Sequence, residues 1–412
     1  TLNMLNKYSL KNILLLIISF SMSYLMAQEK IVLFNVNVID GLNSTVQKDM
    51  MVFISNGKIE SIKNIGSKPK GYKEIDLNGM YILPGFIDAH THISSLDAAK
   101  RALESGVTTA RSASTSSFQD VSIREMVKAR KLVGPDMIAA GIFVTPNLGE
   151  TILADVRLAN LVNGVNKENE LRKLVQINAD RGVDFIKTRG TERAGLPYTD
   201  PRKQTYTEKQ LSIIVNEASK YNIPVMAHAH GDEGGYAAVK AGVRSIEHGT
   251  YLSKRTLSLM KEKGTYLVPT YTTVVDLTEP GGDYDNPVLF IRGQHMLPAL
   301  ETTVKTAYKM GVKIATGADT RYGPNSTTRI GMEITNFVDL GMKPIDAIRS
   351  ATIIGAELLM IADKTGTIEV GKEADLIVVT KNPLKDIRTI QDVVFVMSNG
   401  EIAFKRIPFN KE

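Results

Sequence analysis

Two histidines separated by one residue, His90 and His92, are the first side chains along the chain that could do chemistry. They close the segment PGFIDAHTH at 84–92, which ends an apolar run. In a β-strand, residues i and i+2 point to the same face, so both imidazoles would converge on one point. Two neutral imidazoles suit a divalent metal such as zinc, whose nitrogen ligands lie at about 2.0–2.1 Å. Two chance polar residues near a strand end would show the same spacing, so the remaining ligands must decide.

Five of the six histidines lie at or just beyond the end of a short apolar run that predicts a strand. Besides the first pair they are His228, His230 and His248, whereas His295 lies in a loop-to-helix region and is expected to be an ordinary surface residue. Packing does not explain five imidazoles on one face, because a core gains nothing from histidine over leucine. The pattern therefore favours a metal site.

A lysine reaches the same face, because the apolar segment 183–187 ends at Lys187. Lysine is seldom buried without a reason. Its amine could extend to solvent or pair with an acid such as Glu192. Alternatively, desolvation and neighbouring metal ions would lower its pKa, so that the amine reacts with carbon dioxide and becomes a carbamate. A carbamate is an anion with two oxygens and can bridge two divalent ions.

The segment 312–319 ends with a carboxylate, Asp319, at the end of the last predicted strand of the middle region. A carboxylate in this place can touch a metal and also carry a proton from an attacking water to a leaving amine. A helix N-cap ahead of Thr320 and Arg321 is the structural alternative. Asp88 shares the strand face of the first histidine pair but lies deeper, and we expect it to be a buried partner rather than a ligand.

The elements that must position these residues alternate between strands and helices from about 85 to 365. Eight candidate strands end at or span 90–92, 107–110, 137–143, 183–187, 224–228, 243–248, 266–270 and 312–316. Amphipathic helical stretches lie between them at 123–132, 168–180, 207–221, 233–241 and 298–310. This order predicts an α/β protein with a (β/α)8 TIM barrel, whose active site lies at the carboxyl ends of the strands. The alternative fold is a doubly wound open sheet, but the sequence has no Gly-x-Gly-x-x-Gly after the first strand to support it.

Both ends of the chain are β-rich. Short β-forming runs broken by Asp40-Gly41 and Asn56-Gly57 fill 30–83, and similar runs return after 366, with Asn399-Gly400 predicting a hairpin turn. We therefore expect a small β-sandwich-like domain built from 28–84 plus 366–412, with a metal-dependent hydrolase barrel at 85–365 inserted between them.

The first 27 residues predict a secretory signal peptide. They contain no acid, carry Lys7 and Lys11, run through an apolar stretch at 13–20 and end near Ala27. An uncleaved anchor is the rival, but the apolar run is shorter than the roughly 20 residues that a spanning helix needs. We expect a periplasmic or secreted protein with no stable membrane anchor after cleavage.

Charge and cysteine content exclude several classes of protein. Fifty Lys and Arg against 44 Asp and Glu give a formal charge of +6 over 412 residues, which is too small and too scattered to indicate nucleic-acid binding. The chain has no cysteine, so disulfides and thiolate metal sites are excluded. Any metal must be held by His, Asp, Glu or a group made from Lys.

Six motifs together carry a resemblance to a known family. They are PGFIDAHTH (84–92), DFIK (184–187), AHAHG (227–231), SIEHG (245–249), TGAD (316–319) and GKEADL (371–376). The chain resembles the amidohydrolase superfamily from about residue 30 onward, in particular the two-metal, imidazolonepropionase-like branch that contains Xaa-Pro dipeptidase-like and ochratoxinase-like enzymes. The motifs are specific as a set, although each alone is not.

The resemblance implies a binuclear metal site, usually of zinc. His90 and His92 would hold one ion and His228 and His248 the other, and a carbamate on Lys187 would bridge them. Asp319 would also bind the first ion and shuttle the proton.

The residues alone do not choose between His228 and His230, because both would face inward. The family pattern assigns His228 to the metal and leaves His230 near the substrate, where it could stabilise the developing oxyanion. True imidazolonepropionases use one metal and lack a lysine on this strand, so Lys187 argues against that activity.

The segment 188–193 stands where many relatives have a smaller, glycine-rich turn. Arg189 or Arg193 in this segment could form a forked pair with a substrate carboxylate. A solvated pair with Glu192 is the alternative.

We expect a metal-dependent amidohydrolase that cleaves the amide bond of a dipeptide or an N-acyl amino acid, a dipeptidase-like or carboxypeptidase-like amidase. A metal-bridging hydroxide would attack the carbonyl, and Asp319 would relay the proton to the amine. Cyclic-amide opening or deamination at the same metal site is the alternative. A non-enzymatic barrel scaffold is disfavoured, because all six ligand positions are filled. We expect a small-molecule substrate. The sequence leaves open whether the protein forms a homo-oligomer.

Overall fold

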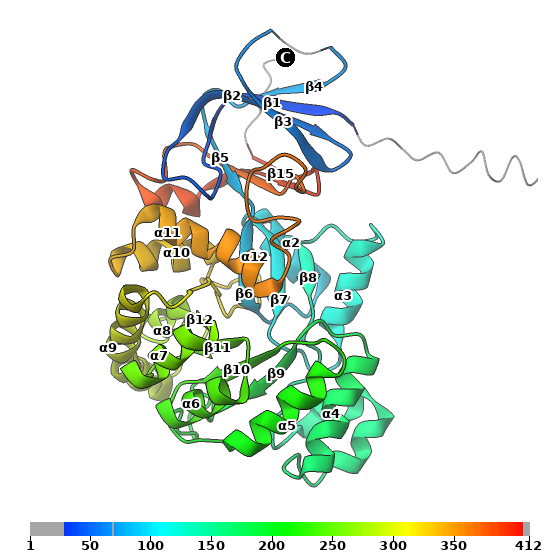
Figure 1. Ribbon diagram of the computed structural model, residues 1–412, viewed down its shortest axis with the longest axis vertical. Coiled ribbons are helices and arrows are strands. Elements are labelled where there is room, and N and C mark those ends of the chain that lie inside the picture. The colour runs from blue at the N-terminus through cyan, green and yellow to red at the C-terminus, as the bar shows by residue number, and fades with distance from the viewer. Residues whose placement is uncertain (1–28, 68–69, 407–412) are drawn as a thin grey trace, which may run out of the picture.

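The computed structural model describes residues 29–67 and 70–406, which form a β-sheet region and an α/β region (Figure 1). Blue and red segments from the two ends of the chain lie together at one end of the molecule, and the cyan to orange middle forms the other. The predicted signal segment at 1–27 lies outside the described residues. Among the described residues, no helix is long and apolar enough to cross a membrane.

Strands from both ends form one mixed sheet, in the order β15-β14-β13-β5-β1-β2-β3, with β4 paired to β1. β5 joins the two ends, because it pairs parallel to β1 and antiparallel to β13. Asn399-Gly400 forms the predicted hairpin turn, with φ of 51° and 75°, as a type I′ turn requires. The strands are β1 (Ile31–Val38), β2 (Gln47–Ser55), β3 (Lys58–Asn64), β4 (Lys73–Asp76), β5 (Tyr81–Pro84), β13 (Leu376–Val379), β14 (Val393–Ser398) and β15 (Glu401–Lys405).

The middle of the chain alternates strands and helices as predicted, and its strands pair in parallel. Three form the sheet β6-β7-β8 and four form the sheet β12-β11-β10-β9. The strands are β6 (Phe86–Thr91), β7 (Val107–Ser112), β8 (Asp136–Ile138), β9 (Ile186–Arg189), β10 (Val225–Ala229), β11 (Ser245–His248) and β12 (Tyr266–Val268). These strands are buried, since helices cover them, and they place polar side chains where the strands end.

The helices of this region follow the strands along the chain. They are α2 (Leu96–Glu104), α3 (Gln119–Lys128), α4 (Glu168–Asp180), α5 (Glu208–Ser219), α6 (Asp232–Ala241), α7 (Lys254–Lys263), α8 (Tyr271–Asp276), α9 (Pro287–Met310), α10 (Ile330–Asp339), α11 (Pro344–Ser350) and α12 (Ile353–Leu359). α4 has the predicted bounds. α9 begins eleven residues before the expected start at Pro298, because Asn286 caps its first turn through its side chain and Pro287 occupies the first helical position.

The prediction of a regular strand at 312–316 is wrong. Only a single bridge, from Ile314 to Leu267 on β12, involves this segment. Backbone hydrogen bonds nevertheless tie it to both neighbours, from Ala315 N to Leu267 O at 2.9 Å and from Ala89 N, on β6, to Thr316 O at 3.0 Å. The Thr316 N–H bonds instead to Ser350 O at the end of α11, so a continuous ladder does not form. The segment lies between β12 and β6 all the same, and it carries Asp319.

A close backbone approach fixes this segment against β6. A Cβ atom added to Gly317 would lie 2.7 Å from Cβ of His90 and 2.7 Å from Cγ1 of Val268. Neither distance is compatible with an undistorted structure, so only glycine lets Asp319 reach the end of the first parallel strand.

We therefore expect Gly317→Ala to lower the free energy of unfolding by about 1–3 kcal/mol through overpacking. Thermal unfolding followed by circular dichroism measures this change. Gly323→Ala is the matched control, because its added Cβ would meet only Ser326 Cβ at 4.0 Å. Equal stability of the two variants would contradict the role of Gly317.

Candidate metal centre

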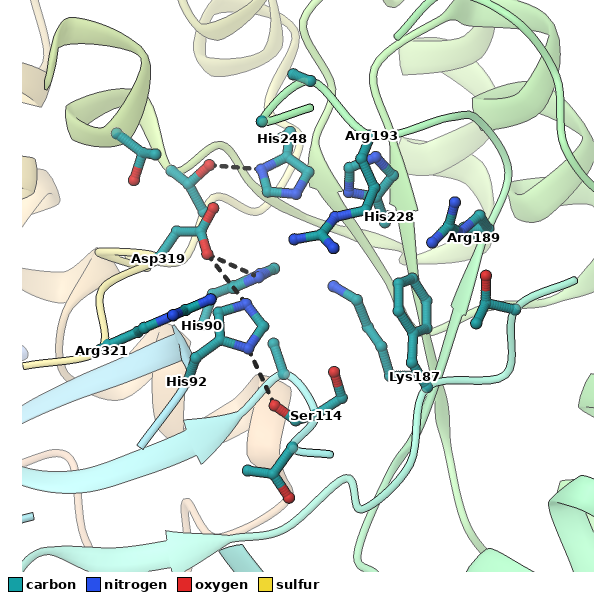
Figure 2. Close-up of a pocket in the computed structure, with 18 of the residues that line it drawn as sticks. His90, His92, Ser114, Lys187, Arg189, Arg193, His228, His248, Asp319 and Arg321 are labelled. Atoms are coloured by element: carbon teal, nitrogen blue, oxygen red, sulfur yellow. Dashed lines mark hydrogen bonds and ion pairs between the residues drawn. The ribbon is translucent and has the colours of Figure 1, made fainter. Parts of the chain in front are cut away.

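A cavity of about 450 Å³ opens where the parallel strands end (Figure 2). Its lining contains every predicted site residue of the middle region, although these residues come from segments more than 200 positions apart. They are His90, His92, Lys187, Arg189, His228, His230, His248 and Asp319. The structure therefore brings together the set that the sequence indicated. His295 lies apart on α9, exposed, with its Nδ1 2.9 Å from the Tyr251 hydroxyl.

One cluster of possible ligands combines His90, His92 and Asp319, whose ligand atoms all lie within 4.8 Å of one another. Oδ1 of Asp319 is 3.5 Å from Nε2 of His90 and 3.2 Å from Nε2 of His92 (Figure 2). His90 is almost fully buried, whereas His92 and Asp319 are partly open to the cavity.

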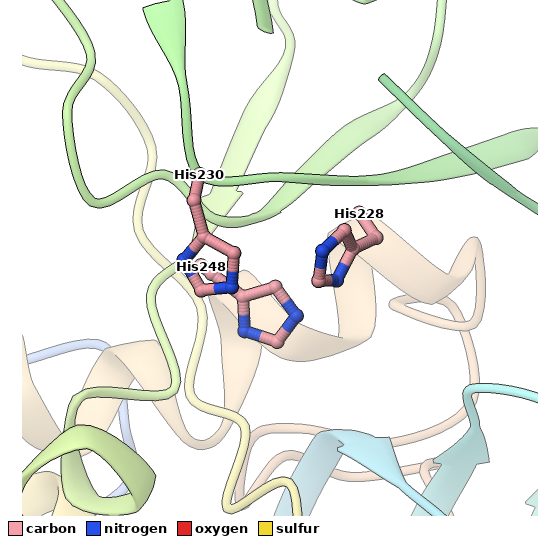
Figure 3. A group of neighbouring side chains, drawn as sticks. All are labelled: His228, His230 and His248. Atoms are coloured by element: carbon pink, nitrogen blue, oxygen red, sulfur yellow. The ribbon is translucent and has the colours of Figure 1, made fainter. Parts of the chain in front are cut away.

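A second cluster combines His228, His230 and His248, all buried (Figure 3). The rings of His230 and His248 stack with centroids 4.6 Å apart, and the ring of His228 stands nearly perpendicular to both. His230 and His228 are therefore both close to His248. The position alone does not choose between them as metal ligands, which the sequence also left open.

Three of the five rings donate a hydrogen bond to a group that can only accept. These bonds join His90 Nδ1 to Glu247 Oε2 (2.6 Å), His92 Nδ1 to Ser114 O (3.0 Å) and His228 Nε2 to Glu192 O (2.9 Å). Because a carbonyl or carboxylate oxygen has no proton to give, the ring nitrogen must carry it. The other nitrogen of each neutral ring is left with a bare lone pair.

His230 and His248 have a different kind of partner. Nδ1 of His230 is 2.8 Å from the Thr250 hydroxyl, and Nδ1 of His248 is 2.7 Å from the Thr270 hydroxyl. A hydroxyl can donate or accept, so either tautomer of these two rings is satisfied.

The donor sets fit divalent metal ions. Burial lowers the pKa of His90 to about 4 and that of His230 to about 3, and it also lowers the pKa values of His228 and His248. In the first cluster Nε2 of His90 and Nε2 of His92 both face Oδ1 of Asp319, so two ring nitrogens and a carboxylate oxygen converge on one point, as the ligands of a divalent ion do. Burial alone would raise the pKa of Asp319, but His90, His92 and Lys187 outweigh it and hold that pKa far below its usual range.

Lys187 points into the cavity from β9, and its amine lies over the Phe143 ring at 5.7 Å from the ring centroid (Figure 2). Its Nζ is buried and lacks a hydrogen bond within the described part of the chain. Burial lowers its pKa to about 8, although the charges of Glu247 and Asp319 oppose this. Glu192, the alternative partner, pairs with Lys203 at 2.9 Å instead. A buried, unpaired amine with a lowered pKa has the properties that carbon dioxide capture requires.

A buried ion pair beneath the first cluster was missed by sequence reasoning. Glu247 accepts two hydrogen bonds from Nη2 of Arg111, at 2.9 and 3.1 Å, as well as the bond from His90. Arg111 is fully buried, donates to Ala89 O at 2.7 Å and lies over the Phe185 ring at 4.9 Å. The sequence did contain a sign of this pair. Two residues of opposite charge lie at strand ends: Arg111 directly after 107–110, and Glu247 directly before His248.

Asp88 is a buried partner, as expected. It accepts hydrogen bonds from the Tyr322 hydroxyl at 2.7 Å and from Ala318 N at 3.0 Å. Burial raises its pKa to about 7. It thereby fixes the segment that carries Asp319.

Known proteins with similar sequences and structures agree with this geometry. The model of the amidohydrolase family matches residues 81–403. The chain belongs to the amidohydrolase family. It is 26% identical over 370 residues to ochratoxinase of Aspergillus niger, covering 78% of this chain and 75% of that protein.

Two solved structures of this family are also similar to the chain. One is a Xaa-Pro dipeptidase with methionine bound in its active site, at 30% identity and a TM-score of 0.82, covering 91% of this chain and 99% of the other. The other is a prolidase in complex with N-methylphosphonate-L-proline, at 25% identity and a TM-score of 0.81, covering 91% and 100%. Fold neighbours of this family imply a TIM barrel for the α/β region. Metal-dependent hydrolysis of an amide bond is the reaction that the family and the two ligand clusters support.

The ion pair beneath the first cluster gives a test of that centre. Glu247→Gln keeps an acceptor for His90 but removes the charge, and we expect the affinity for the bound metal to fall about 10- to 100-fold, as for other outer partners of ligating histidines. Chelator competition with the folded variant measures it. Glu357→Gln, which removes an exposed partner of Lys313, is the control. Unchanged affinity in Glu247→Gln would contradict the role of Glu247.

Proposed function

We propose that the protein is a zinc-dependent amidase that hydrolyses a dipeptide or an N-acyl amino acid. The observation that carries the proposal is the meeting of two three-residue ligand clusters around a buried, unpaired lysine amine in one cavity. A lone cluster would suit a structural ion, whereas two clusters and a reactive amine suit a two-metal hydrolase.

The proposed ligand assignment follows from the tautomers. His90, His92 and His228 give their N–H groups to acceptors, so each has a lone pair available for a metal. We assign His248 to the second ion with His228, and its Nδ1–H to Thr270. The carbamate formed on Lys187 would lie between the two ions, and Asp319 would bind the first.

His230 has a distinct proposed role. Its neutral ring can accept a hydrogen bond from the Thr250 hydroxyl at Nδ1, which leaves an N–H at Nε2 for the substrate. That N–H would donate to the carbonyl oxygen as negative charge develops on it.

The proposed reaction adds one water across the amide bond. Two divalent ions, when bound, supply Lewis-acid polarisation and lower the pKa of water from 15.7 to about 7. Asp319 accepts the proton of the attacking water and passes it to the amide nitrogen as the carbon–nitrogen bond breaks. His230 stabilises the carbonyl oxygen, and Arg189 holds the substrate carboxylate.

Arg189 is suited to that task because its guanidinium is preorganised and unpaired. It lies over the Phe143 ring at 4.7 Å, and its buried Nε has no hydrogen-bond partner in the described residues. The alternative pair with Glu192 does not form, since the Glu192 carboxylate bonds to Lys203 and to Asp200 N.

For the proton shuttle we expect Asp319→Asn, loaded with zinc, to lower kcat by about 10²- to 10⁴-fold, because asparagine cannot relay a proton. Steady-state assays on a library of dipeptides and N-acyl amino acids, with metal content measured in parallel, give the result. Asp346→Asn, on α11 beside Arg349, is the control. Undiminished amidase activity in Asp319→Asn would refute the shuttle.

For the carbamate we expect wild-type protein kept in bicarbonate to gain the mass of one carbon dioxide in native mass spectrometry, and Lys187→Met to lose it and to bind less metal. Lys313→Met, which removes an exposed lysine paired with Glu357, should behave as wild type. An unmodified wild-type protein that holds two metal equivalents would contradict the carbamate.

We also propose export and a two-domain organisation. The proposed export rests on the first 27 residues, and a mature N-terminus near Gln28 would support it. The proposed boundaries, 28–84 plus 366–412 around 85–365, rest on the sheet shared by both ends.

A further inference from the structure

The mouth of the cavity holds more positive charge than one substrate carboxylate can neutralise. Beyond the ligand clusters it is lined by three guanidinium groups, those of Arg189, Arg193 and Arg321. Among the residues that the structure describes, the only carboxylate in the lining is that of Asp319, which belongs to the first ligand cluster.

None of the three arginines forms an ion pair or a side-chain hydrogen bond within 29–67 and 70–406. Arg189 is half-buried, and burial followed by the charge of Arg193 lowers its pKa to about 10. Two adjacent guanidinium groups without a carboxylate between them repel, and an anionic ligand relieves that repulsion.

The acidic side chains nearest to the mouth already have partners. Asp283 accepts hydrogen bonds from Thr327 N and from the Thr328 hydroxyl, and Asp276 accepts one from the Thr327 hydroxyl. Glu192, as described, is held by Lys203. Within the described residues none of these three carboxylates forms an ion pair with the arginines of the mouth.

The arginines flank the ligand clusters from two sides. Figure 2 shows Arg321 beside His92, whereas Arg189 lies across the cavity, beyond Lys187. Tyr284 also lines the cavity.

The loop that carries Arg193 is held in place by a fourth arginine. Arg292 on α9 donates to the backbone oxygens of Leu196 and Thr199, both at 2.6 Å, and to that of Ala194 at 2.5 Å. Arg193 therefore stands on a fixed loop rather than on a mobile one.

We propose that the cavity has two anion subsites, Arg189 with Arg193 on one side and Arg321 on the other, so that the substrate is a dianion. It is an N-acyl amino acid or dipeptide with the carboxylate of its amino-acid half and a second carboxylate in its acyl half. This proposal rests on the proposed amidase function and narrows its substrate class. Hydrolysis of such a compound yields a dicarboxylate and an amino acid, with water as the only co-reactant.

The experiment uses four related amides and the zinc-loaded protein. N-succinyl-L-alanine carries both charges, N-succinamoyl-L-alanine lacks the acyl one, N-succinyl-L-alaninamide lacks the other, and N-succinamoyl-L-alaninamide lacks both. We expect each lost carboxylate to lower kcat/KM by about 10- to 100-fold, the range for hydrogen bonds to charged groups.

Arg189→Gln should abolish the preference for the carboxylate of the amino-acid half and keep the preference for the acyl carboxylate. Arg321→Gln should do the reverse. Arg388→Gln, which removes an exposed arginine paired with Asp339, should keep both preferences and is the matched control. If the charged and neutral acyl halves are cleaved equally well, the two-subsite proposal is overturned while the amidase function stands.

If none of the four amides is cleaved, the amidase function fails for this substrate class, and calorimetric binding of N-succinyl-L-alanine then tests the subsites. Binding that weakens about tenfold in Arg321→Gln but not in Arg388→Gln would support them. Equal affinity in the two variants would overturn them.

Discussion

The site depends on which ring nitrogen of the imidazoles donates a hydrogen bond to the protein. Glu247, Ser114 O and Glu192 O are acceptors without a proton, so one nitrogen of His90, of His92 and of His228 is engaged as a donor and the other is left to face a ligand. This orientation leaves ring nitrogens in both clusters available to a metal ion. The ion pair of Arg111 with Glu247 supports this arrangement. Burial alone would raise the pKa of Glu247 and favour its neutral form, but the charge of Arg111 lowers that pKa and keeps the carboxylate ionised.

The backbone holds the ligands in conformations that most residues avoid. His248, Thr270 and Asp319, all at the ends of strand segments, have φ of 72°, 46° and 46°. Such left-handed residues cost about 1–3 kcal/mol each when they are not glycine, and they persist only where the surroundings determine them. Here the surroundings are buried strands and the contact between Gly317 and His90. All three side chains line the cavity, whereas Glu247, the neighbour of His248 on the same strand, is fully buried against Arg111.

The sequence predicted the α/β order and the set of polar side chains at the cavity, because both depend on local patterns. His-x-His spacing, apolar runs before Lys187 and Asp319, and Asn-Gly turns are visible without knowledge of distant contacts. Glu247 was not predicted as a partner of His90, because 157 positions separate them and alternation along the strand places Glu247 and His248 on opposite faces. The early start of α9 was missed: the predicted helix began at Pro298, whereas Asn286 and Pro287 form the actual cap. The irregular segment at 312–316 was read as a strand because its apolar pattern is that of a strand.

The balance of charge explains why a lysine can stand at the middle of the centre. Arg111 and Glu247 neutralise each other, and within the described part of the chain Asp319 is the one carboxylate in the cavity lining, so two divalent ions would leave a positive excess in the cavity. The excess is reduced if the Lys187 amine, which burial already holds at a pKa of about 8, becomes an anion. Even then the arginines at the mouth have no carboxylate partner in the described part of the chain, and the dianionic substrate that we propose would supply the remaining negative charge. The same imbalance that favours the modified lysine inside the cavity therefore selects for anionic groups at its entrance.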